Sequence, residues 1–109
     1  MKELIKVRGY QVAPAELEAL LLTHPQLSDA AVIPLPDEDS GELPRAYVSL
    51  KYGVDEDDVT EDDVKDFVKE RVAPFKRLEG GVKFIDKVPK SASGKILRRM
   101  LVDQLKTEG

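Results

Sequence analysis

The chain has 109 residues, of which 41% are hydrophobic and 35% charged, with a formal net charge of −4. This length suits one domain with a modest core, and no apolar run is long enough to span a membrane. The lack of cysteine and the single histidine exclude disulfides, thiolate chemistry and a transition-metal site built from this chain.

The charges are distributed unevenly along the chain. Residues 55–66 hold eight acids and one lysine, whereas residues 83–99 hold six Lys or Arg against Asp86 alone. We expect the basic stretch to attract anions. The acidic total argues against a dedicated nucleic-acid binder but leaves room for a small phosphorylated ligand.

The first half of the chain predicts a hairpin, a helix and two strands. Residues 5–12 alternate apolar and polar side chains around a glycine, which indicates two short strands and a tight turn. Residues 14–24 place leucines on one helical face behind a proline suited to the first turn. The apolar run 29–36 and the alternating run 45–52 predict two strands with a loop between them.

The second half predicts a helix, a strand and a final helix. Thr60 and Asp63 resemble a capping box that opens a helix, and Pro74 stops it. Residues 80–88 supply a strand, and an amphipathic helix follows from Ile96. We therefore predict a single α+β domain with a small mixed sheet of about three main strands, covered by helices, plus an N-terminal β-hairpin.

The segment 89–99, PKSASGKILRR, has the composition of a phosphate-binding loop. It is not a Walker-type loop, because Pro89 and Ile96 stand where that pattern requires glycine and a hydroxyl. Gly94 permits close backbone approach, and Lys95 at the mouth of a helix can reach a phosphate. Alternatively, the segment only caps the last helix and Lys95 is a solvated first-turn residue. The spacing alone favours that alternative.

A second candidate site lies in the predicted hairpin. Arg8 and Gly9 form a basic turn that can hold an anion, and Gln11 adds one amide. Taken alone, this stretch is better explained as an ordinary turn.

Together, the two stretches IKVRGYQVAPAELEALLLTHP and VPKSASGKILRRML closely resemble the C-terminal domain of adenylate-forming enzymes. This superfamily contains acyl-CoA synthetases, firefly luciferases and peptide-synthetase adenylation domains. The words GYQVAPAELE and GKILRR are most similar to the branch of 4-coumarate:CoA ligases and luciferases. The resemblance covers nearly the whole chain and implies that residues 1–109 are one C-terminal lid domain.

The resemblance implies a two-step reaction. Family members join a carboxylic acid to ATP, giving an acyl-adenylate and pyrophosphate, and then pass the acyl group to the thiol of coenzyme A. A large N-terminal domain binds most of the substrate and the Mg²⁺, while the C-terminal domain rotates and offers a different face to each step. We expect this domain to need that N-terminal partner, and to be inactive without it.

By position, Lys95 matches the lysine that reaches into the site during adenylation, so the resemblance implies a catalytic role for it. An ammonium delivered to the α-phosphate stabilises the charge that its oxygens gain as the carboxylate attacks. No metal ligand is expected in this chain.

Other positions also match binding positions of the family. Lys6 and Gln11 match positions around the bound AMP, and Arg8 and Gly9 match a turn that borders coenzyme A. Lys2 matches an AMP-site lysine beside the interdomain hinge, but the Asp-Arg-Leu that normally precedes it is missing. We expect the chain to be a domain separated from its partner at the hinge.

Two other functions remain open on the sequence. A luciferase-like monooxygenase would carry the same C-terminal domain. A non-enzymatic α+β module could instead bind single-stranded RNA through Tyr47, Tyr52 or Phe84 and the basic stretch. We expect a cytoplasmic location, because the chain ends in LKTEG and lacks the peroxisomal Ser-Lys-Leu address that some relatives carry.

Overall fold

The computed structural model describes residues 4–108. The elements, in chain order, are β1 (Ile5–Val7), β2 (Tyr10–Val12), α1 (Pro14–Leu21), β3 (Leu27–Asp37), β4 (Gly41–Leu50), α2 (Glu61–Lys69), the short 3-10 helix η1 (Pro74–Lys76), β5 (Val82–Phe84) and α3 (Arg98–Glu108). This order confirms the predicted α+β fold and the predicted sequence of strands and helices.

The strands form one mixed sheet of five strands in the order β2-β1-β4-β3, with β5 pairing parallel to β4. The N-terminal hairpin belongs to this sheet, because β1 pairs with β4 at Val7 and Gly41. In the antiparallel pair β3–β4, Leu27 lies opposite Leu50 at one end, and Asp37 lies opposite Gly41 at the other. Most of the loop predicted between the two strands is therefore strand. Only a tight turn remains, in which Gly41 takes a φ of 84°.

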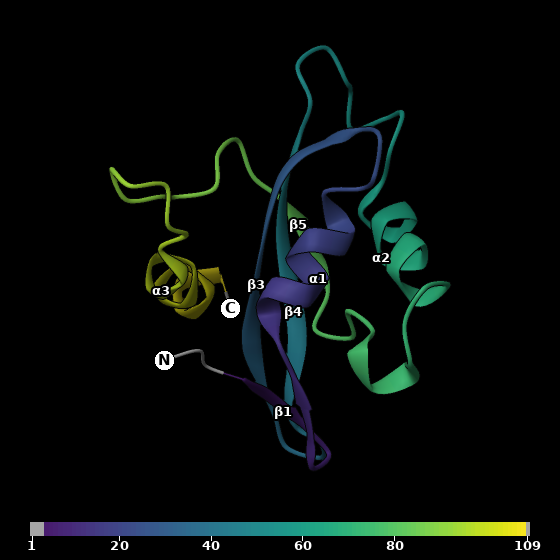
Figure 1. Cartoon of the computed structure of the whole chain (residues 1–109), viewed down its shortest axis with the longest axis vertical. Helices are drawn as coiled ribbons and strands as arrows, with labels where there is room; N and C mark the ends of the chain where they lie inside the picture. Colours follow the sequence, from purple (N-terminus) through teal and green to yellow (C-terminus); the bar gives the residue numbers. More distant parts are fainter. Residues whose placement is uncertain (1–3, 109) are drawn as a thin grey trace.

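Helices cover both faces of the sheet (Figure 1). On one face, called here the α1–α2 face, α1 and α2 bury apolar side chains against the sheet. The main contributors are Leu17, Leu21, Val32, Ala46, Val48, Val64 and Val68. On the opposite face, called the α3 face, a smaller cluster is covered by α3. It contains Ala31, Ile33, Tyr47, Val88 and Leu101. Residues of β3 therefore alternate between the two cores, as the period of a strand requires.

Three element ends differ from the sequence prediction. β4 stops at Leu50, so Tyr52 is fully exposed and does not continue the buried face of the strand. α2 begins with the predicted capping box of Thr60 and Asp63 but already ends at Lys69, before Pro74. α3 begins at Arg98, later than predicted, because the residues before it form a separate turn.

Candidate functional site

Residues 90–97, called here the Lys95 turn, form a small hairpin before α3. The Gly94 N–H donates to the Ser91 carbonyl at 2.9 Å, and the Ser91 N–H donates to the Lys95 carbonyl at 2.9 Å. The Ser91 hydroxyl oxygen accepts from the Lys95 N–H at 3.2 Å and lies 3.0 Å from the Ser93 hydroxyl. A β-turn followed by a left-handed residue is a common way to close a three-residue hairpin loop.

Gly94 supplies that left-handed residue, with a φ of 87°. A Cβ at this position would meet nothing within 4 Å, so no neighbouring group of this chain requires a glycine here. The positive φ is what favours glycine at this position. Lys95 lies three residues before α3 begins. The alternative that makes Lys95 a first-turn residue is therefore wrong, and Lys95 does not lie directly at the mouth of the helix as predicted.

The base of the Lys95 turn is also hydrogen-bonded. Lys90 and Ile96 form an antiparallel bridge, and the Leu97 N–H donates to the Pro89 carbonyl at 2.9 Å. Ile96 packs against the core of the α3 face. Lys95 itself is exposed, and its ammonium forms no ion pair with residues 4–108. The turn thus presents one amine to solvent from an ordered backbone.

The basic stretch 83–99 is only in part available to anions. Three of its cations pair with carboxylates elsewhere in the domain. The pairs are Lys83–Glu108 at 3.5 Å, Lys90–Asp29 at 2.6 Å and Arg98–Glu18 at 2.5 Å. Within residues 4–108, no such partner is found for Lys87, Lys95 or Arg99. The expected attraction of anions therefore concentrates around the Lys95 turn.

The second candidate site is the β1–β2 turn. Arg8 has a φ of 47° and Gly9 a φ of 86°, which is the backbone of a type I′ hairpin turn. Arg8 is held against the neighbouring β3–β4 turn, because its N–H donates to the Ser40 carbonyl at 2.8 Å and its Nη1 donates to the Ser40 hydroxyl at 3.0 Å. These hydrogen bonds hold the β1–β2 turn in place beside the β3–β4 turn.

Lys6 and Gln11 are paired across the same hairpin and both are exposed. Directly opposite residues in an antiparallel pair place their side chains on the same face, so these two form one polar surface. The Lys6 N–H donates to the Glu42 carboxylate at 2.9 Å. Figure 1 places this hairpin and the Lys95 turn at different ends of the domain, so the structure does not bring the two candidate sites together. Lys2 lies outside the described residues.

A family model described as the AMP-binding enzyme C-terminal domain matches residues 16–95. The chain belongs to this family. Among curated proteins, it is 58% identical over 101 residues to the 4-coumarate:CoA ligase 1 of Petunia hybrida, covering 93% of this chain and 18% of that protein.

Comparison with solved structures supports the same family. A fatty acyl CoA synthetase from Mycobacterium tuberculosis superimposes with a TM-score of 0.84 at 33% identity, over 96% of this chain and 20% of that one. The o-succinylbenzoate CoA synthetase of Bacillus subtilis, in complex with its acyl-adenylate intermediate, gives a TM-score of 0.75 at 35% identity, over 90% and 19% of the two chains. The chain thus spans about a fifth of the length of these relatives.

The alternative of an RNA-stacking surface is not favoured in this domain. Tyr47 is completely buried beneath α3, Tyr52 lies beyond the end of its strand, and Phe84 is partly buried against the opposite core. The three rings do not share an exposed sheet surface, which base stacking requires.

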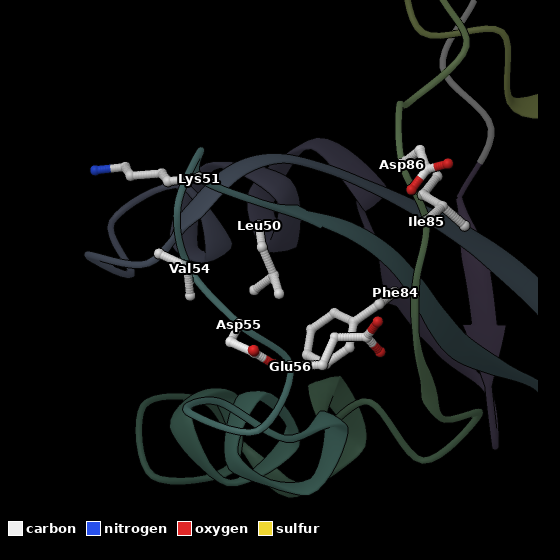
Figure 2. Close-up of a pocket in the computed structure, with 8 residues that line it drawn as sticks. All are labelled: Leu50, Lys51, Val54, Asp55, Glu56, Phe84, Ile85 and Asp86. Atoms are coloured by element: carbon white, nitrogen blue, oxygen red, sulfur yellow. The ribbon is translucent and has the colours of Figure 1, made fainter.

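One hollow of the domain has the wrong charge for a nucleotide. It measures about 400 Å³ and lies between the end of β4 and the segment 84–86 (Figure 2). Its lining includes Asp55, Glu56 and Asp86, and the Lys51 side chain points away from it. Three carboxylates repel phosphate, so this hollow is not a candidate site.

No group of three His, Asp or Glu side chains within residues 4–108 is arranged to hold a metal ion. The residues of this part of the chain therefore do not fit a Mg²⁺ site. No helix of the described chain is long and apolar enough to cross a membrane.

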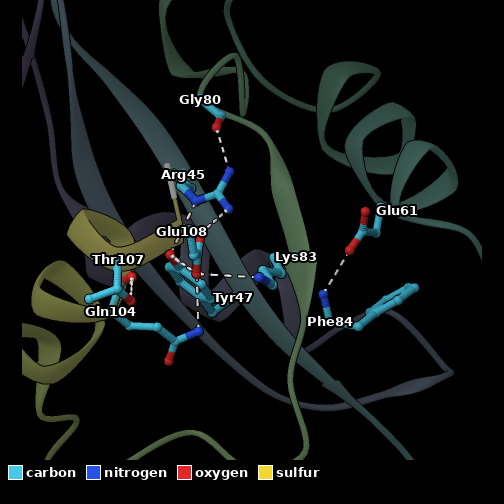
Figure 3. A network of polar contacts seen from close by, with 9 residues as sticks. All are labelled: Arg45, Tyr47, Glu61, Gly80, Lys83, Phe84, Gln104, Thr107 and Glu108. Carbon is cyan, nitrogen blue, oxygen red and sulfur yellow. Dashed lines mark hydrogen bonds and ion pairs between the residues drawn. The ribbon is translucent and has the colours of Figure 1, made fainter.

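A polar network that the sequence did not predict attaches the end of α3 to the sheet (Figure 3). Glu108 accepts hydrogen bonds from Arg45 at 2.8 Å and from the Tyr47 hydroxyl at 3.1 Å. Burial alone would raise the pKa of Glu108, but hydrogen bonds from Gln104 and Tyr47 and the charges of Arg45 and Lys83 outweigh it and lower that pKa. No local pattern predicts these partners.

Glu18 is the second feature that was missed. It lies on the buried side of α1 beside Leu17, with its side chain only 8% exposed. A carboxylate on an apolar helix face signals a buried partner, because unpaired buried charge is costly. That signal is present in the sequence, although it does not say which residue is the partner.

Proposed function

We propose that this domain is the mobile C-terminal part of an ATP-dependent, AMP-forming ligase that joins an acyl or aryl carboxylic acid to coenzyme A. The observation that carries the proposal is the exposed Lys95 ammonium, presented by an ordered turn in a chain whose relatives are CoA ligases. ATP and coenzyme A would be bound together with the N-terminal domain of the complete enzyme.

In the first half-reaction, a carboxylate oxygen attacks the α-phosphorus of ATP and the bond to the β-phosphate breaks, releasing pyrophosphate. The non-bridging α-phosphate oxygens gain negative charge in the transition state, and Lys95 supplies a positive charge to them. An interaction that is stronger in the transition state than in the ground state accelerates the step. The exposed position of Lys95 supports this role.

In the second half-reaction, the thiol sulfur of coenzyme A, having lost its proton, attacks the acyl carbon and AMP leaves. We assign the hairpin to this step, with Arg8 and Gly9 bordering coenzyme A and with Lys6 and Gln11 facing the adenylate. The separation of the hairpin from the Lys95 turn supports a rotation between the two steps, because one orientation of the domain cannot bring both to the same bond.

A domain exchange tests the proposal. This chain replaces the C-terminal domain of the Petunia hybrida 4-coumarate:CoA ligase 1, and the thioester is measured with ATP, coenzyme A and 4-coumarate. We expect the chimera to form the thioester, whereas this chain alone and the truncated ligase do not. A folded chimera without activity, or strong salt-dependent RNA binding by this chain, would contradict the proposal.

Two parts of the proposal lie beyond the described structure. Lys2 is assigned to the hinge side of the AMP site, and the complete enzyme is assigned to the cytoplasm. Both stay predictions. A Lys2→Ala substitution in the chimera tests the first, with slower turnover as the expected result, and fluorescence microscopy of a tagged complete enzyme tests the second.

A further inference from the structure

The Glu18 carboxylate is the point where three segments of the domain meet. Its Oε2 accepts the Val32 N–H at 2.8 Å and the Arg98 Nε at 3.1 Å, and its Oε1 accepts the Arg98 Nη2 at 2.5 Å. Val32 belongs to β3, and Arg98 is the first residue of α3. One buried carboxylate on α1 therefore binds both an edge strand and the helix that follows the Lys95 turn.

The bond to Val32 fixes where this carboxylate sits. Ala46, the partner of Val32 on β4, donates its N–H to the Gly81 carbonyl on the β5 side at 3.0 Å. Opposite residues in an antiparallel pair either direct their N–H groups at each other or both direct them away from their ladder. Because the Ala46 N–H points away from β3, the Val32 N–H points away from β4, to the free edge of β3. Glu18 binds that N–H and thereby places its charge at the sheet edge, between the two faces.

Arg98 completes a link around that edge. α1 lies on one face of the sheet and α3 on the other, and among the ion pairs of residues 4–108 this one alone joins helices on opposite faces. The two Arg98 nitrogens contact both Glu18 oxygens, which restricts orientation as well as distance. Arg98 follows Lys95 by three residues, so the link holds one end of the Lys95 turn.

The other end of the turn is held in a similar way. The Lys90 ammonium lies 2.6 Å from the Asp29 carboxylate on β3. Lys90 and Ile96 form the bridge that closes the turn. The backbone around Lys95 is thus attached on one side to α1, through Arg98 and Glu18, and on the other side to β3, through Lys90 and Asp29. These contacts argue for an ordered turn, although the segment 86–94 has few large apolar residues.

We propose that Glu18 and Arg98 are positioning residues that fix the direction in which the Lys95 turn presents its ammonium during adenylation. The inference rests on the proposed function of Lys95. Neither residue contacts substrate in this account, and both act through the position of the turn. A displacement of about 1 Å at a reacting group costs up to about 10²-fold in rate, so a residue that prevents it matters for turnover.

The test uses the chimera with the Petunia hybrida ligase and compares Glu18→Gln with Arg98→Gln. Adenylation is measured as pyrophosphate exchange into ATP, and thioester formation is measured from preformed acyl-adenylate. We expect each variant to slow adenylation by about 10–100-fold and to change thioester formation less than about threefold. Arg98→Gln keeps the bond between Glu18 and Val32, so it remains informative if Glu18→Gln unfolds the domain.

A double substitution separates positioning from general stability. In a chimera that already carries Lys95→Ala, we expect Glu18→Gln to cause no further loss of adenylation, because the group that it positions is gone. Glu16→Gln is the matched control, since Glu16 also lies on α1 in an ion pair, with Lys76 at 2.7 Å, and does not contact the turn. We expect this control to leave adenylation unchanged.

The possible outcomes are distinct. Equal loss in both half-reactions, further loss in the Lys95→Ala background, or a loss with Glu16→Gln as large as with Glu18→Gln would overturn the positioning role. Normal adenylation in both Glu18→Gln and Arg98→Gln would overturn it as well. If Lys95→Ala itself leaves adenylation intact, the proposed function of Lys95 fails, and the inference fails with it.

Discussion

The two faces of the sheet are stabilised in different ways. On the α1–α2 face, two helices bury a continuous apolar cluster that also includes residues of all five strands. On the α3 face, one helix covers a smaller cluster and is bound by charged pairs at both ends, through Arg98 at its start and Glu108 at its end. The helix that follows the Lys95 turn is therefore the one that depends most on charge.

This difference has a physical consequence for function. Apolar burial is strong but has no preferred direction, whereas bidentate charged hydrogen bonds fix an orientation. The α1–α2 face supplies most of the stability, and the charged pairs of the α3 face define where α3 and the preceding turn lie. Changes on the two faces should therefore produce different defects.

The largest loss of stability is expected on the α1–α2 face. Leu17 is completely buried there, and Leu17→Ala removes apolar contacts and leaves a cavity. We expect the free energy of unfolding to fall by about 2–5 kcal/mol, measured by urea denaturation. Leu22→Ala, at a position that is 50% exposed, is the control and should change it by less than about 0.5 kcal/mol. A smaller effect of Leu17→Ala than of Glu108→Gln would reverse the comparison.

An intermediate loss is expected when the end of α3 is released. Glu108→Gln removes the charge that Arg45 binds, and the Arg45 side chain is only 17% exposed. We expect a loss of about 2 kcal/mol in the free energy of unfolding, together with faster amide exchange in the last turn of α3. Unchanged exchange there would mean that the apolar cluster alone holds α3.

The smallest effect is expected at Lys83, which is 42% exposed and lies 3.5 Å from Glu108. Lys83→Gln should cost less than about 1 kcal/mol, because exposed ion pairs contribute little. The same denaturation measurement separates this contact from the Arg45 contact. A loss as large as that of Glu108→Gln would assign the attachment of α3 to Lys83.

The two faces should also respond to acid in different pH ranges. Burial and the charge of Arg71 lower the pKa of His24 below 6.5 on the α1–α2 face, against an opposing effect of Asp63. The folded state then binds fewer protons than the unfolded state, so this contribution to stability is lost as the pH falls below about 6.5.

Glu108, on the α3 face, has a folded-state pKa below its ordinary value of 4.5. Its contribution is present above that value and is lost as the pH falls through the lowered pKa. The free energy of unfolding, measured by urea denaturation, should fall once below about pH 6.5 and again as Glu108 is protonated. We expect His24→Asn to flatten the first fall and Glu108→Gln to flatten only the second. If either variant flattened both declines, the two faces would not be independent.

The parts of the fold that sequence predicted well are local. The capping box of α2 joins Thr60 and Asp63, three residues apart, and the β1–β2 turn depends on adjacent residues. The link between Glu18 and Arg98 joins residues that are 80 positions apart, and Glu18 also accepts a buried N–H at the edge of β3 that no neighbouring strand binds. No local pattern contains that information.

For the candidate site, too, the sequence predicted one part and missed another. The resemblance selected Lys95, and the structure shows the turn that presents it, but the helix boundary was misplaced by local periodicity. Apolar residues such as Ile96 and Leu97 continue the helical pattern, although Ile96 pairs with Lys90 in a bridge instead. Pairing within this short hairpin overrode the helical propensity of the segment.

The most direct test of the account is the rate of acyl-adenylate formation in the chimera that carries Lys95→Ala. The control is Lys87→Ala, an exposed lysine of the same segment outside the turn. We expect Lys95→Ala to slow adenylation by about 10²–10³-fold, with thioester formation from preformed adenylate largely retained and Lys87→Ala without effect. Adenylation at the normal rate in the Lys95→Ala chimera would contradict the account.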